Sequence, residues 1–159
     1  MKKQNLLLPA ILALAIASCK KEKNDQSKDI PVTTLIIGNW KATSIAEIDY
    51  TDGIRTGYDT IANYPLIQFK QFNKDGTGTS TNNLFTYEKF NFSISGRTLT
   101  LTNDTVTDYN DKTKSRLPDR VFKIIKVNSA TLGLYYEVPP YVEDGKNKSF
   151  TQNTYYTRQ

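Results

Sequence analysis

Short stretches in which apolar and polar residues alternate constrain the fold of this chain more than any other feature. Threonine, tyrosine and phenylalanine are frequent in these stretches, turn residues separate them, and no apolar stripe of helical period is longer than two turns. The pattern predicts an all-β domain. Its expected strands are residues 36–48, 66–72, 77–81, 86–94, 98–102, 120–127, 131–138 and 149–158.

The segments between these strands mostly predict hairpins, so neighbouring strands should run antiparallel. Residues 73–76 are typical of a type I turn whose glycine takes the left-handed conformation, and residues 95–97 predict a second short turn. Residues 103–119 are polar and predict a long loop. Pro139 and Pro140 predict the end of a strand, because proline cannot donate a ladder hydrogen bond.

The number of strands favours a closed sheet. An open antiparallel sheet would leave two edge strands with unpaired backbone groups, and closing the sheet removes both edges. Eight strands are a common number for a closed barrel. We therefore expect an antiparallel up-and-down eight-stranded barrel. A sandwich of two sheets is the alternative, since its strands alternate with the same period.

The N-terminal residues have the three parts of an export signal. A pair of lysines comes first, residues 6–17 are almost entirely apolar, and Ser18 is the small residue that precedes Cys19. The apolar run is too short to span a bilayer, which takes about 20 residues. The pattern predicts a signal peptide at residues 1–18.

Cys19 is the only cysteine of the chain, and the sequence Ile-Ala-Ser-Cys resembles the lipobox of bacterial lipoproteins. In that family the cysteine carries several acyl chains, which together anchor a protein stably in a membrane. The resemblance implies lipid attachment at Cys19. It also implies an outer-membrane location, because Lys20 is not the acidic residue that retains some lipoproteins in the inner membrane. Residues 19–34 then predict a flexible tether, and residues 35–159 the domain. A cleaved secretory signal that leaves a free thiol is the alternative.

The ends of the predicted domain resemble those of the lipocalin family. Gly38 and Trp40 form a Gly-x-Trp sequence in the first strand, and Arg158 lies in the last strand. Residues 68–78 and 94–101 resemble small lipocalin-like domains of bacterial lipoproteins. The resemblance implies a lipocalin-like, or calycin, barrel in which Trp40 plugs one end and Arg158 packs across its ring. A guanidinium over an indole contributes about 0.5–2 kcal/mol and would join the first strand to the last.

The sequence offers little catalytic chemistry. It contains no histidine, the commonest general base, and its single cysteine is assigned to lipid. We therefore expect no enzyme activity, no catalytic residue, no metal and no cofactor. Asp104, Asp108 and Asp111 leave a glycan hydrolase as an alternative, although solvated loop charge explains them more simply. No basic stripe crosses the domain, so no nucleic-acid partner is expected, and we expect a monomer.

A ligand would lie inside the predicted barrel. Small side chains on the face that Trp40 shares would leave space above the tryptophan. The residues that could line this cavity are Ala42, Ser44, Phe69, Phe90, Phe92, Leu134 and Tyr136. A cavity predicts a non-enzymatic protein that binds a small apolar or amphipathic ligand. A filled barrel would instead predict a structural lipoprotein whose surface contacts an envelope protein or a glycan.

Overall fold

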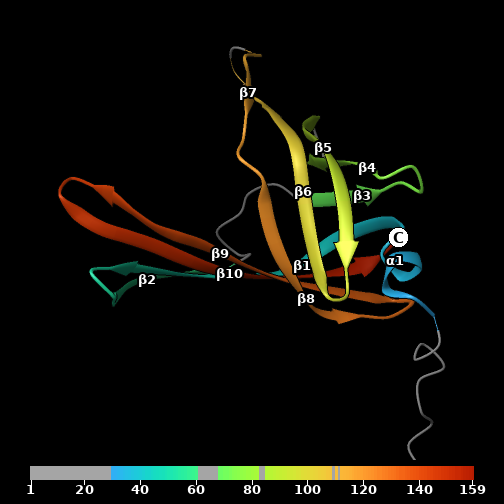
Figure 1. Ribbon diagram of the computed structural model, residues 1–159, viewed down its shortest axis with the longest axis horizontal. Helices are drawn as coiled ribbons and strands as arrows, with labels where there is room; N and C mark the ends of the chain where they lie inside the picture. The colour runs from blue at the N-terminus through green and yellow to red at the C-terminus, as the bar shows by residue number, and fades with distance from the viewer. Residues whose placement is uncertain (1–29, 61–67, 83–84, 109, 111) are drawn as a thin grey trace, which may run out of the picture.

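Ten strands and one short helix make up the described part of the computed structural model, which covers residues 30–60, 68–82, 85–108, 110 and 112–159 (Figure 1). The elements are α1 Val32–Leu35, β1 Gly38–Thr51, β2 Ile54–Thr60, β3 Gln68–Phe72, β4 Thr77–Asn82, β5 Thr86–Ser95, β6 Thr98–Thr107, β7 Lys114–Arg116, β8 Arg120–Val127, β9 Thr131–Glu143 and β10 Lys146–Arg158. No helix within these ranges is long and apolar enough to cross a membrane. The expected signal peptide and Cys19 lie outside the described residues.

Eight of the described strands form a closed ring. They pair antiparallel in the order β1-β3-β4-β5-β6-β8-β9-β10, and β10 pairs in turn with β1. The predicted up-and-down barrel is therefore confirmed, and the sandwich alternative is wrong, because the first and last strands are neighbours in one sheet. β2 and β7 lie outside the ring, where β2 pairs with the outer half of β1 and β7 with the end of β6.

The two short turns predicted from the sequence are present. The N–H of Asn73 donates to the carbonyl of Thr77 at 2.8 Å, and Gly76 takes the left-handed conformation with φ 84°. Gly96, with φ 57°, forms the turn between β5 and β6. Both glycines occupy backbone conformations that other residues adopt at a cost.

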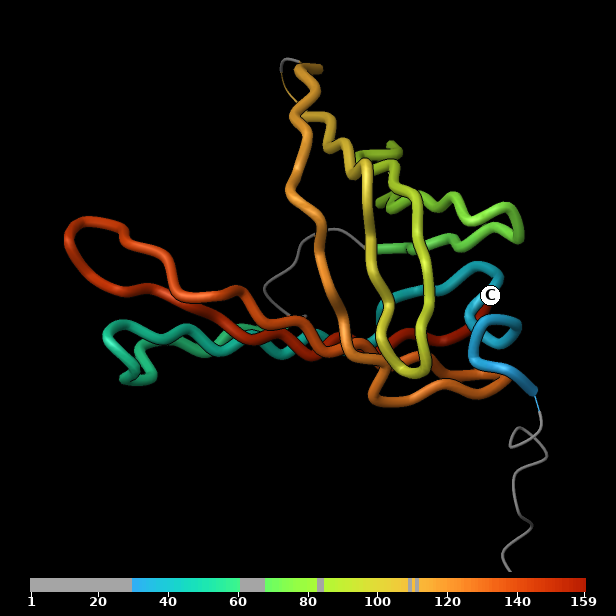
Figure 2. Tube along the Cα trace, viewed as in Figure 1, coloured from blue at the N-terminus to red at the C-terminus, as the bar shows by residue number. Residues whose placement is uncertain are grey.

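Four strands continue beyond the barrel as an arm, which lies at the left of Figures 1 and 2. The arm consists of β2, residues 46–51 of β1, residues 137–143 of β9 and residues 146–152 of β10. Its hairpin turns are Asp52-Gly53 and Asp144-Gly145, in which both residues have the positive φ of a type I′ turn. The N–H of Asp52 donates to the carbonyl of Asn147 at 2.7 Å, so the two hairpins are tied near their tips.

Two sequence predictions are wrong in the arm. The segment after β1 forms the strand β2, where only a loop was expected. β9 also continues through Pro139 and Pro140, where its end was predicted. Both prolines are tolerated because the pairing register shifts between Lys148 and Phe150 of β10. Among the described strands, this part of β9 pairs only with β10, and the bulge interrupts that pairing. Neither proline is therefore required to donate a ladder hydrogen bond.

A bulge in β6 decides which side chains enter the barrel. Asn103 has φ 51°, and the register shifts there, so that Asn103 and Asp104 together lie opposite Phe90. The alternation of side chains reverses after the bulge, and Asp104 points inward with 0% exposure. The predicted loop at residues 103–119 is wrong, since β6 runs on to Thr107 and β7 follows it.

The closed end of the barrel is built around Trp40, which is fully buried. Its indole N–H donates to the carbonyl of Ile36, at the end of α1, at 2.7 Å. Phe72 meets Phe92 edge to face in the same core, with ring centroids 5.0 Å apart. The buried core cluster comprises Ile36, Trp40, Ala42, Phe72, Phe90, Leu99, Leu101, Phe122, Ile124, Leu132, Leu134 and Tyr156.

Arg158 fastens the last strand to this end of the barrel. The guanidinium carbon lies 4.2 Å from the centroid of the Trp40 ring. The guanidinium also donates hydrogen bonds to the carbonyls of Ser129 and Ile37, both at 2.7 Å, and to the carbonyl of Leu35. One side chain of β10 thus joins the turn between β8 and β9, the segment before β1, and the buried indole.

We expect Arg158→Met to lower the free energy of unfolding by about 3 kcal/mol, because three carbonyls lose a charged donor and the indole loses its cation. Urea unfolding at neutral pH measures the change, with the slope of the transition unchanged. Lys126→Met, on the exposed face of β8, is the matched control. Equal stability of the two variants would show that Arg158 does not support the closure.

Candidate functional site

The barrel interior changes character along its length. Apolar side chains fill the half around Trp40, whereas charged and polar side chains enter the half in which β3, β5 and β8 begin. A cavity of about 120 Å³ lies in this second half. Its lining residues are Gln68, Lys70, Tyr87, Glu88, Arg120, Phe122, Leu134, Tyr136, Gln152, Thr154 and Tyr156. This cavity is the candidate functional site.

Strand alternation brings three of the charged side chains inward. Lys70 on β3, Glu88 on β5 and Arg120 on β8 each lie two residues before a buried phenylalanine of the same strand, and so face the same side. A fourth charged residue, Asp104, enters through the bulge in β6. The sequence analysis missed Lys70, Glu88 and Arg120. The sequence does contain a signal for them: in three separate strands a charged residue lies two positions before a phenylalanine and so shares its face.

These four residues, Lys70, Glu88, Asp104 and Arg120, form one network that we call the ionic cluster. Lys70 Nζ donates to Glu88 Oε2 at 3.0 Å and to Ser80 Oγ at 2.7 Å, and the Ser80 hydroxyl donates in turn to Glu88. Arg120 Nη2 donates to Glu88 and to Asp104, and so bridges the two carboxylates. The cluster therefore places two cations against two carboxyl groups inside the barrel.

The pKa values of the two carboxyls move in opposite directions. Burial alone would raise the pKa of Glu88, but the charges of Lys70 and Arg120 and its hydrogen bonds outweigh burial and lower this pKa to about 2. At Asp104, burial and the nearby charge of Glu88 raise the pKa. Burial also lowers the pKa of Lys70, although Glu88 opposes that change. Glu88 is thus the carboxylate that the cluster holds ionised most firmly.

Two buried atoms of the ionic cluster have no hydrogen-bond partner among the described residues. They are Oδ1 of Asp104 and Nε of Arg120. Most buried polar atoms in proteins are paired, so these two retain capacity for a further polar group. Arg120 lines the cavity. A polar ligand group placed there would meet a guanidinium whose hydrogen-bonding capacity is not fully used.

Aromatic rings form the other wall of the cavity. Phe122 and Tyr136 stack with ring centroids 4.8 Å apart, and Tyr136 meets Phe150 edge-on at 6.1 Å. Phe150 lies on the part of β10 that belongs to the arm, so the row of rings leads from the cavity toward the arm. Burial raises the pKa of Tyr87 to about 12 and also raises the pKa of Tyr156. Both phenol groups can therefore donate hydrogen bonds at neutral pH.

The structure places five of the predicted cavity residues inside the barrel. Leu134 and Tyr136 line the cavity itself. Ala42 and Phe90 belong to the packed core, and Phe92 packs against it. The interior near Trp40 is therefore filled, and the cavity lies farther along the barrel than the sequence predicts.

Ser44 and Phe69 face outward, and their prediction as cavity residues is wrong. A bulge between Ala42 and Ser44 reverses the alternation of β1, so Ile45, at 3% exposure, takes the inner position. Phe69 alternates on β3 with Lys70, and it is Lys70 that lines the cavity. Ser44 therefore leaves no space above the tryptophan.

Of the three carboxylates that were predicted to share one loop, the two that the structure describes lie in different surroundings. Asp104 is buried in the barrel, whereas Asp108 is exposed beyond the end of β6, and Asp111 lies outside the described residues. Within the part of the chain that the structure describes, no group of three or more histidine, cysteine or acidic residues could hold a metal ion. Asp104 and Asp108, the two that the structure describes, do not form the paired site that glycan hydrolysis requires.

A comparison with protein families finds one model, described as a lipocalin-like domain, that matches residues 36–134. The match covers more than half of the chain and includes Lys70, Glu88, Asp104 and Arg120. No curated protein and no solved structure matches the chain.

The ionic cluster predicts how stability depends on pH. The pKa of Glu88 is lowered from 4.5 to about 2, so its carboxylate stabilises the fold above pH 4.5 and loses this contribution as the pH falls toward 2. Glu88→Gln should lower the free energy of unfolding by about 3 kcal/mol at pH 7, because Lys70 and Arg120 lose a buried counter-charge. The free energy of unfolding of this variant should also fall less steeply in acid. Urea unfolding at several pH values measures both effects.

Asp104→Asn provides the opposite case. The pKa of Asp104 is raised, so its ionisation opposes folding. Asp104→Asn should therefore lower the free energy of unfolding at pH 7 by less than Glu88→Gln does, and its stability should still fall in acid. Glu143→Gln, an exposed carboxyl of the arm, is the control. If the stability of Glu88→Gln fell with pH in parallel with that of the unmodified chain, the assignment of Glu88 as the ionised carboxylate would be contradicted.

Proposed function

The chain belongs to the lipocalin-like domain family, and from that premise we propose that it binds one small amphipathic ligand in its barrel and catalyses no reaction. The lipocalin-like barrel is a fold suited to ligand binding. The observation that carries the proposal is the cavity of about 120 Å³, in which aromatic rings face the ionic cluster. A purely apolar ligand would leave the buried Nε of Arg120 without a hydrogen-bond partner, so a ligand with a polar end fits better.

The size of the cavity limits what can enter it. Pockets that enclose a whole drug-sized molecule measure about 300–1,000 Å³. A volume of about 120 Å³ admits only a compact polar group. In our proposal this group lies against Lys70 and Arg120, and the apolar part of the ligand follows the rings of Phe122, Tyr136 and Phe150 toward the arm.

We also propose that the protein is a monomeric bacterial lipoprotein, held at the outer membrane by acyl chains on Cys19. The support comes from the sequence: an export signal at residues 1–18, a lipobox that ends at Cys19, and Lys20 after it. Residues 19–34 were predicted as the tether, but α1 begins at Val32 and packs against the core, so the proposed tether ends at residue 31. The proposal includes no nucleic-acid partner, metal or cofactor.

An interaction role is the second candidate function, and the arm favours it. Ile54 is 70% exposed and Val142 is 71% exposed, and Tyr58 and Tyr141 are exposed near them on the same two strands. In the arm, β2 and β9 each have only one neighbouring strand among the described residues. Exposed apolar side chains on strands with a free edge are typical of protein contact surfaces. This function would be favoured if the barrel takes up no ligand.

We expect the purified chain to bind a fluorescent fatty acid, and organic extraction of the chain followed by mass spectrometry to release a small amphipathic molecule. Thr154→Phe should lower the affinity for the probe about tenfold or more, because the added ring fills a cavity that the Thr154 side chain lines. Fluorescence titration measures the affinity, and thermal unfolding shows whether the variant is folded.

Thr151→Phe is the matched control, since Thr151 lies on the opposite face of the same strand. It should leave the affinity for the fatty acid unchanged. An equal loss in the two variants would place the probe outside the cavity. A chain that yields no extracted molecule and takes up no probe would contradict the ligand proposal.

The anchor has its own test. In a Gram-negative host the unmodified chain should be found in the outer-membrane fraction and be released only by detergent, whereas Cys19→Ala should lose the lipid and leave that fraction. Mass spectrometry of the N-terminal peptide should show acyl chains on residue 19. Recovery of both proteins in the soluble envelope fraction would argue against lipid attachment.

A further inference from the structure

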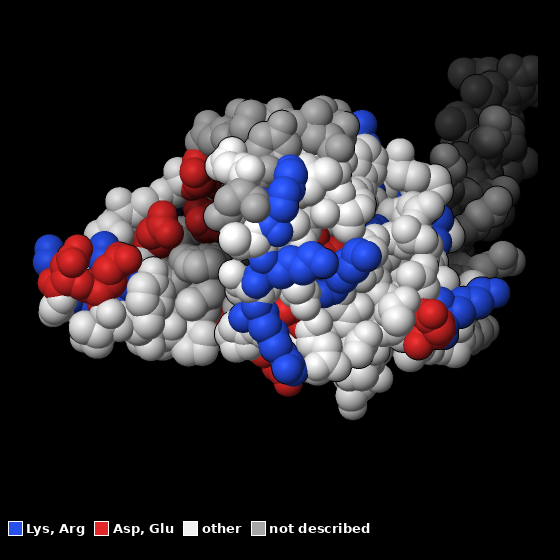
Figure 3. Space-filling view, turned by 90° about the horizontal axis from the view of Figure 1, so that it is seen from above, with Lys and Arg blue, Asp and Glu red and all other residues white. Residues whose placement is uncertain are grey.

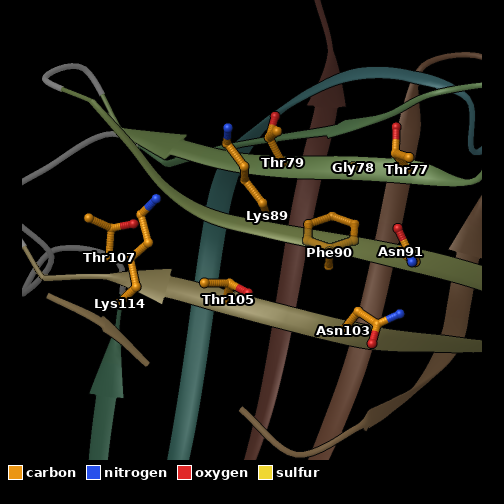
Figure 4. A pocket seen from close by; sticks show the side chains of 10 residues that line it. All are labelled: Thr77, Gly78, Thr79, Lys89, Phe90, Asn91, Asn103, Thr105, Thr107 and Lys114. Carbon is orange, nitrogen blue, oxygen red and sulfur yellow. The ribbon is translucent and has the colours of Figure 1, made fainter. Parts of the chain in front are cut away.

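A second hollow lies on the outside of the barrel, over β4, β5 and β6 (Figure 4). It has a volume of about 490 Å³, within the range of about 300–1,000 Å³ that is usual for ligand sites. Its lining residues are Thr77, Gly78, Thr79, Lys89, Phe90, Asn91, Asn103, Thr105, Thr107 and Lys114. We call this hollow the outer groove. It shares no lining residue with the cavity in the barrel.

Strand pairing explains which side chains meet in the outer groove. Lys89 on β5 pairs with Thr79 of β4 on one side and with Thr105 of β6 on the other. Thr107 pairs with Lys114 of β7 in the same way. Directly opposite residues have Cβ atoms about 4.5–5.5 Å apart, so each lysine lies beside threonine hydroxyls. Figure 4 shows the two lysines toward one end of the groove and the two asparagines toward the other.

The outer groove is basic, and neither Lys89 nor Lys114 has an acidic partner among the residues that the structure describes. No acidic residue lines the groove, and every ion pair found among the described residues belongs to the ionic cluster inside the barrel. Arg116 lies next to the groove, where its Nη2 donates to Asn103 Oδ1 at 2.7 Å. This bond uses the amide oxygen of Asn103 as acceptor, so that the amide N–H groups of Asn103 can donate to a ligand. The groove therefore presents positive charge together with neutral hydrogen-bonding groups.

The charges of the wider surface are unevenly distributed. Figure 3 shows Lys and Arg side chains gathered near the middle of one face of the molecule, and Asp and Glu side chains gathered toward the end that the arm occupies. Together with its two hairpin turns, the arm carries seven acidic and three basic residues. An anionic molecule is therefore repelled from the arm and attracted to the barrel.

We propose that the outer groove binds an acidic glycan, a chain of sugars that carries carboxylate or phosphate groups. Lys89 and Lys114 pair with the acidic groups, since charge-assisted hydrogen bonds are roughly twice as strong as neutral ones. Thr79, Thr105 and Asn91 exchange hydrogen bonds with the sugar hydroxyls, because hydroxyl and amide groups both donate and accept. This site lies on the outer face of the sheet, so the proposal does not depend on the ligand of the barrel.

Other anionic or extended partners fit the groove less well. A peptide that adds as a strand needs a free strand edge, whereas β5 is paired on both sides beneath the groove. Single-stranded nucleic acid stacks its bases on exposed aromatic rings, but Phe90, the one aromatic residue of the lining, is 3% exposed and lies against Gly78. Stable binding to a membrane surface combines charge with inserted apolar side chains, and the groove lining offers no exposed large apolar side chain.

The proposal is tested by titrating the full chain, in detergent and at low salt, with oligogalacturonate as the acidic glycan. Isothermal titration calorimetry should show binding of this probe and no binding of a neutral glucose oligomer of the same length. Lys89→Gln combined with Lys114→Gln should weaken binding by about tenfold for each lysine, because each substitution removes a charged donor. Both residues are exposed on outer faces, so the variant should remain folded.

The control is Lys123→Gln combined with Lys126→Gln, which removes the same charge from the exposed face of β8, away from the groove lining. It should keep the affinity of the unmodified chain. An equal loss in both double variants would reduce the effect to net charge and overturn the proposal. The proposal is also overturned if oligogalacturonate does not bind, if the neutral oligomer binds as well, or if short polyphosphate or single-stranded RNA binds more tightly.

Discussion

The pairing of the first strand with the last is the constraint on which the rest of this structure depends. β1 and β10 are neighbours from Trp40 to Thr51, the end of β1, and this contact turns an open sheet into a barrel. Arg158 reinforces it at the closed end, where one guanidinium covers the indole of Trp40 and holds three carbonyls. Without this closure the interior would be one face of a sheet, and neither the core nor the cavity would be enclosed.

Closure also explains why charged residues are tolerated inside. A buried charge is costly unless it is paired and hydrogen-bonded. The barrel brings Lys70, Glu88, Asp104 and Arg120 together from four strands, so each charge finds an opposite one. The polar half then sits between the packed core and the arm. This change from an apolar to a charged interior, more than the volume of the cavity, leads to the proposal of an amphipathic ligand. The outer groove lies on the opposite face of the sheet and is lined by a separate set of polar residues.

Much of the fold could be predicted because its signals are local. Alternation marked the strands of the ring, glycine marked the turns at Gly76 and Gly96, and the resemblance at Trp40 and Arg158 indicated the closed end. Strand ends were predicted less well. Pro139 and Pro140 look like a stop in the sequence, yet they lie in a strand that has only one neighbour, and that context is not visible locally. The candidate site was only partly predicted, since Leu134 and Tyr136 line the cavity but its charged residues were missed.

The sequence by itself determined the fold class and the order of the eight barrel strands along the chain, because periodicity and turn chemistry act between near neighbours, and its resemblance to lipocalins indicated the residues that close the barrel. Only the tertiary structure decided which side chains point inward after a bulge. The shift at Asn103 turns Asp104 into the barrel, and the shift before Ser44 turns that residue out. A bulge exists only relative to a partner strand, so the inner and outer faces of β1 and β6 could not be assigned until their neighbours were known.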